Sequence, residues 1–308
     1  MKPTPEPAIE TLKQHGRSFY FASQFLDPRY RNRAARLYAF CRHIDDLADE
    51  SDDSAVAQAE LAHIKTQLAT AQGQDPHTLD MLSLMRDTAM PASPVMSLIE
   101  GVESDLQGLE IHSEADLINY AYSVAGTVGL MMSIVLDVHD ENAWPFAIDL
   151  GIAMQLTNIA RDIGEDASKN RVYLPTAWVG ELDPQKIRHP DTQLQQTLRT
   201  NTKRILDLAE HYYRSGLSGL HYLPKQARTA ILVAAQVYRE IGQLIRRSGY
   251  STWDRRTVVS LPRKLACATG TLTRYLLIDR KNQTSLHNLD LHAALTDRFG
   301  AHKQTTHE

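Results

Sequence analysis

The 308-residue chain contains only two cysteines, Cys41 and Cys267, and neither lies in a C-x-x-C pair or at the Cys/His spacing of a zinc site. This scarcity excludes a disulfide framework and is typical of a reducing compartment. Charge of one sign is not in excess either, because 33 Lys and Arg residues face 37 Asp and Glu residues. Without a long basic run, the sequence does not indicate a nucleic-acid partner.

Long apolar runs and nucleotide-binding motifs are also missing. The longest apolar stretch, residues 129–136, is far shorter than the ~20 residues that span a bilayer. Residues 1–7 lack the apolar core of a signal peptide. We therefore expect a cytoplasmic protein with at most a peripheral membrane contact. Neither G-x-x-x-x-G-K-[ST] nor G-x-G-x-x-G occurs, so a P-loop or dinucleotide fold is not supported.

The sequence does contain helical patterns throughout, without the sustained alternation that marks half-buried strands. An all-α fold is therefore expected. The breaks between helical segments are short, and no Ser/Gly-rich linker occurs, so we expect one domain over residues 1–280 and a polar C-terminal tail over residues 281–308. Asp27 followed by Pro28 predicts a helix start, with Asp27 as the N-cap.

Two aspartate clusters are the most informative feature of the chain. Asp45 and Asp49 are four residues apart in one helical segment, and Asp162 and Asp166 are four apart in another. Like charges at this spacing destabilise a helix by roughly 0.2–0.5 kcal/mol per pair unless a cation neutralises them. One acidic run alone also fits a solvated helix end, as residues 50–53 illustrate, but two matched clusters favour bound divalent metal ions.

The helical period places each cluster on a polar stripe beside an apolar arc. At about 100° per residue, each stripe is roughly 60–80° wide. Carboxylates at the edge of an apolar arc predict a semi-buried cavity between two facing helices. The first stripe contains Tyr38, Arg42, Asp45 and Asp49, and the second contains Gln155, Asn158, Asp162 and Asp166.

This set of oxygen ligands suits a hard cation such as Mg²⁺, with Mn²⁺ as an alternative. Mg²⁺ usually binds through one or two carboxylates together with substrate phosphates. Arg42, Arg161 and Arg171 lie near the clusters and can bind phosphate through bidentate hydrogen bonds. Because no nucleotide motif occurs, a helical chamber with apolar walls favours a diphosphate on a hydrocarbon tail, which is an isoprenoid diphosphate.

These residues resemble those of the squalene and phytoene synthases, which join two prenyl diphosphates head to head. The resemblance covers most of the chain and includes both aspartate-rich motifs in full. Its segments are H-G-R-S-F-Y at 15–20, L-Y-A-F-C-R-H-I-D-D-L-A-D at 37–49, Y-A-Y-S-V-A-G-T-V-G at 120–129, Q-L-T-N-I-A-R-D-I-G-E-D at 155–166, R-V-Y-L-P at 171–175, and V-Y-R-E-I at 237–241, with similarity to about residue 264.

The resemblance implies a helical bundle of the isoprenoid-synthase type around a central apolar cavity. It also implies residue roles. Metal ligation falls to Asp45, Asp46, Asp49, Asn158, Asp162 and Asp166. The residues expected to bind diphosphate are Ser18, Arg42, Gln155, Arg161, Arg171 and Tyr238. The residues expected to be catalytic are Arg42, Asp45, Asp49, Asp162, Asp166 and Tyr238. The expected walls of the apolar chamber are Phe19, Tyr20, Leu130, Met131 and Met154, although ordinary core packing also explains Met131 and Met154.

The implied reaction is the Mg²⁺-dependent condensation of two geranylgeranyl diphosphates to phytoene through a cyclopropyl diphosphate. Squalene or dehydrosqualene formation from farnesyl diphosphate is the alternative, since chain length depends on chamber depth. NADPH is needed only if the final step is reductive. A non-catalytic relative on the same fold is a third reading, which the intact aspartates disfavour. The oligomeric state has no residue signature.

Overall fold

The computed structural model describes residues 6–49, 51, 53–278 and 286–302, and over this part of the chain every regular element is a helix, which confirms the all-α prediction. The elements are α1 Glu6–His15, α2 Arg17–Ser23, α3 Pro28–Asp49, α4 Ser54–Thr70, α5 Pro76–Thr88, α6 Ala92–Leu106, α7 Glu114–Ala121, η1 Tyr122–Gly126, α8 Thr127–Val135, η2 Glu141–Ala143, α9 Trp144–Ser168, α10 Thr176–Val179, α11 Pro184–Arg188, α12 Thr192–Ser218, η3 Gly219–Tyr222, α13 Lys225–Arg247, α14 Leu261–Ile278 and η4 Leu289–His292.

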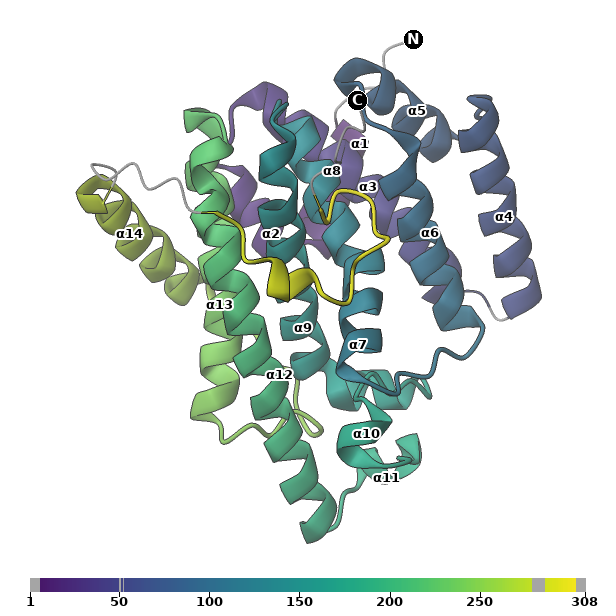
Figure 1. Ribbon diagram of the computed structural model, residues 1–308, viewed down its shortest axis with the longest axis vertical. Coiled ribbons are helices and arrows are strands. Elements are labelled where there is room, and N and C mark those ends of the chain that lie inside the picture. The colour runs from purple at the N-terminus through teal and green to yellow at the C-terminus, as the bar shows by residue number, and fades with distance from the viewer. Residues whose placement is uncertain (1–5, 50, 52, 279–285, 303–308) are drawn as a thin grey trace.

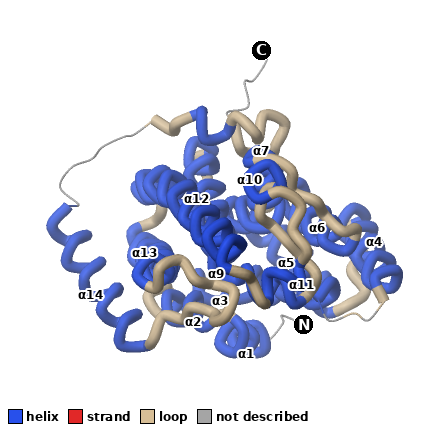
Figure 2. Tube along the Cα trace, turned by 90° about the horizontal axis from the view of Figure 1, so that it is seen from below, coloured by secondary structure: helices blue, strands red, loops and turns tan. Residues whose placement is uncertain are grey.

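The long helix α9 runs through the middle of the bundle (Figure 1). It packs against α8, η1, α12 and α13, whereas α3 packs against α1, α5, α6 and α8. Seen end-on, α12 and α13 lie on one side of α9, and α4 to α6 lie on the other (Figure 2). The helices α3 and α9 carry the two aspartate clusters, so this arrangement gives each cluster its own supporting layer.

Helix α3 begins where the sequence predicts. The Asp27 carboxylate accepts a hydrogen bond from the backbone N–H of Arg29 at 3.0 Å, and Pro28 is the first helical residue. This contact satisfies one of the free N–H groups at the helix start.

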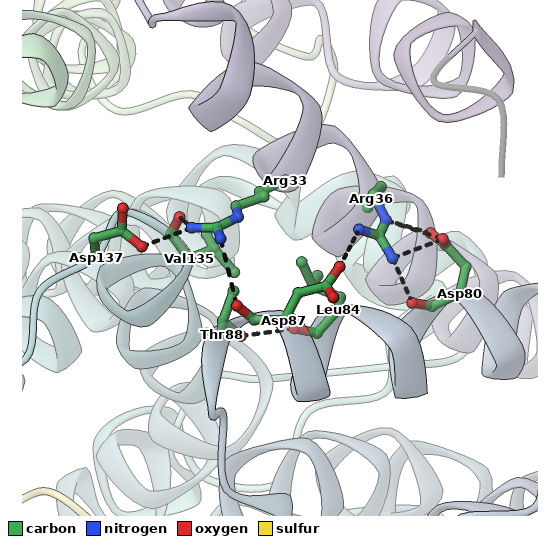
Figure 3. Close-up of polar contacts among 8 residues, drawn as sticks. All are labelled: Arg33, Arg36, Asp80, Leu84, Asp87, Thr88, Val135 and Asp137. Atoms are coloured by element: carbon green, nitrogen blue, oxygen red, sulfur yellow. Dashed lines mark hydrogen bonds and ion pairs between the residues drawn. The ribbon is translucent and has the colours of Figure 1, made fainter. Parts of the chain in front are cut away.

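Two arginines hold α3 against the neighbouring helices (Figure 3). Arg36 donates two hydrogen bonds to the Asp80 carboxylate on α5, at 2.9 and 3.0 Å, and a third to the Asp80 carbonyl. Arg33 donates to Asp137 at 2.6 Å. Both guanidinium groups are largely buried. These charge-assisted bonds fix the rotation of α3, and therefore the direction in which its aspartates point.

Two glycines bring α8 and η1 unusually close to α9. A Cβ added at Gly129 would collide with the Ala147 carbonyl, and one at Gly151 would collide with the Ala125 carbonyl. The backbones touch in both directions, so these small residues serve helix packing. The segment Tyr122–Gly126 between α7 and α8 is a π-helix, η1.

The C-terminal segment 286–302 differs from the polar tail that composition predicts. It crosses the bundle in front of α9 (Figure 1), and Leu295, Ala301 and His292 in this segment are fully buried. Its position is fixed by long-range bonds, such as that from the Tyr122 hydroxyl to the Phe299 carbonyl at 2.7 Å. The rest of the predicted tail, residues 281–285 and 303–308, lies outside the described residues.

One helical stretch, Glu114–Val135, is long and apolar enough to cross a membrane by length and composition, with a mean hydropathy of 1.3. It comprises α7, η1 and α8, and 67% of its apolar window is buried inside the fold. A core helix of a soluble protein has the same properties, so this feature is weak evidence for a membrane span.

Candidate active site

A cavity of about 290 Å³ lies between α3, α8, α9, α12 and α13. Its lining is mostly apolar, and its polar members include Asp45, Gln155, Asn158 and Tyr238. Phe146 lines the same cavity from the other end of α9, about 18 Å from Asn158 along the helix axis at 1.5 Å per residue. The cavity therefore has a polar end and a deep apolar end.

The first aspartate motif reaches the polar end from the last two turns of α3. Asp45 lies deep within the bundle, but its side chain faces the cavity and is therefore open to solvent there. Burial within the protein and the neighbouring Asp49 raise the pKa of Asp45 to about 7. Asp46 pairs with Arg42 one turn earlier on the same helix, so these two predicted site residues neutralise each other.

The second motif lies at a kink in α9. Asp162 has non-helical dihedrals, with φ −105° and ψ 15°. Its carboxylate accepts a hydrogen bond from Arg161 Nε at 2.8 Å and pairs with Arg256 Nε at 3.1 Å. Arg256 comes from the loop after α13. This loop approaches α9 closely at Gly164, where an added Cβ would collide with the Trp253 carbonyl. Sequence reasoning missed Arg256, which carries no recognisable local pattern.

The structure joins the two motifs through ion pairs of Asp49. Its carboxylate accepts hydrogen bonds from Lys169 Nζ at 2.8 Å and from Arg171 Nη1 at 2.6 Å. Burial alone would raise the pKa of Asp49, but these two bonds lower it. Arg171 was predicted for diphosphate binding, whereas Lys169 was not. The residues at the ends of α3 and α9 therefore form one site.

Asp166 and Asn158 have environments that fit a bound divalent cation. Burial and the charges of Asp162 and Glu165 raise the pKa of Asp166 to about 8. The Oδ1 atom of Asn158 is buried without a hydrogen-bond partner among the described residues. Carboxylates that repel one another and an unpaired amide oxygen are a donor set that a hard cation satisfies.

Asp105 on α6 is a further acidic residue at the site that sequence reasoning missed. Its carboxylate accepts hydrogen bonds from the hydroxyls of Tyr120 and Tyr173, each at 2.9 Å. Burial raises its pKa despite these bonds, and its charge interacts with Arg171 and Asp49. Tyr173 lies in the R-V-Y-L-P segment, so Asp105 anchors the loop that carries Arg171.

Aromatic side chains occupy the wall beside the polar end. The Phe19 ring on α2 lies 4.9 Å from that of Tyr238 on α13 and 6.2 Å from that of Tyr38 on α3. All three line the cavity. Ser18 and Tyr20 flank Phe19 on α2 and are partly exposed, but they do not belong to the cavity lining.

The expected chamber walls are only partly those of the structure. Phe19 and Met154 line the cavity, whereas Leu130 and Met131 are fully buried in the core and do not. Val128 and Met132 of α8 line it instead. The lining residues Val124, Val128 and Met132 follow one another at the i, i+4 spacing of one helix face, and Leu130 and Met131 lie on a different face.

Comparisons with known proteins agree with this geometry. The family model for squalene/phytoene synthases matches residues 12–263. A phytoene synthase from Pseudescherichia vulneris is 35% identical over 276 residues, which cover 86% of this chain and 89% of that protein. A 15-cis-phytoene synthase from a Paracoccus species is 37% identical over 268 residues, covering 84% and 87%.

Solved structures extend the comparison to the fold. A dehydrosqualene synthase solved with a ligand superposes with a TM-score of 0.75 at 27% identity, covering 89% of this chain and 96% of that one. A squalene synthase from Alicyclobacillus acidocaldarius has a TM-score of 0.70 at 22% identity, covering 80% and 94%, and supports the fold alone. On the family match over most of its length, the chain belongs to the squalene/phytoene synthase family.

Proposed function

We propose that this chain is a phytoene synthase that condenses two geranylgeranyl diphosphates to phytoene through a cyclopropyl diphosphate, in carotenoid biosynthesis. Family membership makes it a prenyltransferase, and curated relatives at 35–37% identity carry the name phytoene synthase. The observation that carries the proposal is the cavity itself, in which Asp45, Gln155 and Asn158 line one end and apolar side chains line the rest.

The proposed roles follow from the two ends of the cavity. Divalent metal, taken to be Mg²⁺, would be held by Asp45, Asp49, Asn158, Asp162 and Asp166. Asp46 instead pairs with Arg42. Bound metal supplies charge that stabilises the departing diphosphate. Because a carbocation reacts with water, the apolar walls exclude solvent from the reacting carbons.

The basic residues of the site would bind the diphosphate. Arg171 already lies at the junction of the two motifs, and Arg161 and Arg256 flank Asp162. Guanidinium groups bind phosphate oxygens with two parallel hydrogen bonds, which fixes the orientation of the leaving group. A peripheral membrane contact is a prediction that suits an apolar product. A cytoplasmic location is a separate prediction from the sequence.

Product analysis tests the proposal. Purified protein with Mg²⁺ is incubated with geranylgeranyl or farnesyl diphosphate, with and without NADPH, and the hydrocarbons are identified by mass spectrometry. We expect phytoene from geranylgeranyl diphosphate without NADPH, and none from an Asp166→Asn control. Squalene or dehydrosqualene from farnesyl diphosphate as the main product would overturn the substrate assignment. No product from either substrate would support the non-catalytic reading.

A further inference from the structure

A buried carboxylate outside the metal site binds the C-terminal segment to α9. Asp149 is fully buried in the second turn of α9. Its Oδ1 lies 2.7 Å from His292 Nε2, and its Oδ2 lies 2.8 Å from His287 Nε2. Both histidines belong to segment 286–302, and their side chains are at most 8% exposed. Neither aspartate-rich motif includes these three residues.

The hydrogen-bond partners of His292 define its charge. Its Nδ1 lies 2.6 Å from the carbonyl oxygen of Ala301, and its Nε2 faces the Asp149 carboxylate. Burial would raise the pKa of Asp149, but the bonds from His287 and His292 lower it, so the carboxylate is ionised and accepts. Both oxygens are acceptors only, so both nitrogens of His292 must carry hydrogen. The result is a buried carboxylate–imidazolium pair.

The same distances argue against a metal ion between these three residues. Ligand atoms bound tetrahedrally to zinc at about 2.0 Å lie roughly 3.3 Å apart. The observed separations of 2.7 and 2.8 Å are those of direct hydrogen bonds. Two other titratable groups face the cluster. Tyr212 of α12 donates to the Leu291 carbonyl, and the His302 ring lies 6.0 Å from that of His292.

The cluster reaches the cavity through Phe146, one turn before Asp149 on α9. The His287 ring meets the Phe146 ring edge-on, with centroids 5.2 Å apart. On its other side Phe146 contacts Gly219, where a Cβ would collide with the Phe146 side chain. Phe146 is therefore held between η3 and His287, and the orientation of His287 depends on its bond to Asp149.

We propose that Asp149, His287 and His292 form a charged clasp that fixes Phe146 as the deep wall of the chamber and so sets the length of prenyl chain that binds well. This inference rests on the proposed function and extends it to chain-length selectivity. Asp149, His287 and His292 are positioning residues, because they act through Phe146. A geranylgeranyl chain reaches further toward this wall than a farnesyl chain, which is one isoprene unit shorter.

Binding of unreactive substrate analogues tests the clasp. Dissociation constants of farnesyl and geranylgeranyl S-thiolodiphosphate are measured calorimetrically with Mg²⁺ for wild type, Asp149→Asn, His292→Gln and Phe146→Leu. We expect each variant to weaken geranylgeranyl analogue binding at least fivefold and to change farnesyl analogue binding less than twofold. His302→Asn is the matched control, and we expect it to leave both constants unchanged.

The outcomes separate this inference from the proposed function. Equal weakening of both analogues, or no weakening, in the folded variants would overturn the clasp as a selectivity device while the proposed function stands. If Asp149→Asn fails to fold, His292→Gln decides for the clasp, since it removes one of the two bonds to Asp149, while Phe146→Leu tests the wall alone. Failure of wild type to bind either analogue would overturn both proposals.

Discussion

Among single residues, Asp49 and Asp166 have the same expected role but opposite environments. Asp49 binds Lys169 and Arg171, whereas Asp166 is buried beside like charges. We expect Asp49→Asn and Asp166→Asn each to lower kcat by about 100-fold or more, because each removes a proposed metal ligand. In EDTA, however, Asp49→Asn should lower Tm, while Asp166→Asn should leave it unchanged or raise it. A loss of Tm in Asp166→Asn would contradict the repulsion inferred for that carboxylate.

The raised pKa values of Asp45, about 7, and Asp166, about 8, predict a pH dependence of stability. The folded, metal-free protein holds these protons more tightly than the unfolded chain, whose aspartates titrate near 3.8. Stability of the metal-free protein therefore falls as pH rises from about 5 to about 8.5. Mg²⁺ is proposed to bind the ionised carboxylates, so it should raise Tm more at the upper pH. Thermal unfolding at both pH values, with EDTA or Mg²⁺, measures this difference; an equal effect of Mg²⁺ at both would refute it.

At the scale of elements, the close approach of η1 and α9 depends on the absence of a side chain at Gly151. We expect Gly151→Ala to destabilise the protein by more than about 2 kcal/mol, because its Cβ would collide with the Ala125 carbonyl. Gly270→Ala in α14 is the matched control, since no atom lies near its added Cβ, and it should stabilise by about 0.5–1 kcal/mol. Urea denaturation measures both. Similar effects of the two substitutions would show that the helices can separate at no cost.

The same elements show which features the sequence predicts and which depend on the packed fold. The Asp27–Pro28 start of α3 and the two aspartate stripes were predictable, because capping and helical period are local properties. The lining face of α8 was not, since Val128, Leu130, Met131 and Met132 belong to one apolar run and only the packing decides which of them face the cavity. Asp105 was missed for a related reason. Its partners are Tyr120 and Tyr173, and only the packed fold brings them together.

For the whole molecule, composition averaged over the C-terminal residues concealed their role. Polar content predicted a tail from residue 281, yet Leu295 and Ala301 are buried and His292 pairs with Asp149. A chain ended after residue 280 should therefore unfold at a lower temperature, because it leaves the Asp149 charge buried without a partner. A chain ended after residue 302 keeps every described contact and serves as the control. Equal Tm values for the two would contradict the clasp.

The ion pairs of Asp49 predict a coupling between the two components proposed to bind at this site, a divalent cation and a diphosphate. In the free protein Lys169 and Arg171 already neutralise Asp49, so an arriving cation competes with internal counter-ions. An arriving diphosphate attracts the same two basic groups and releases the carboxylate, while the cation releases the basic groups for the diphosphate. We therefore expect a divalent cation and a diphosphate to bind cooperatively, with a reciprocal gain in affinity, because each releases the group at Asp49 that the other needs.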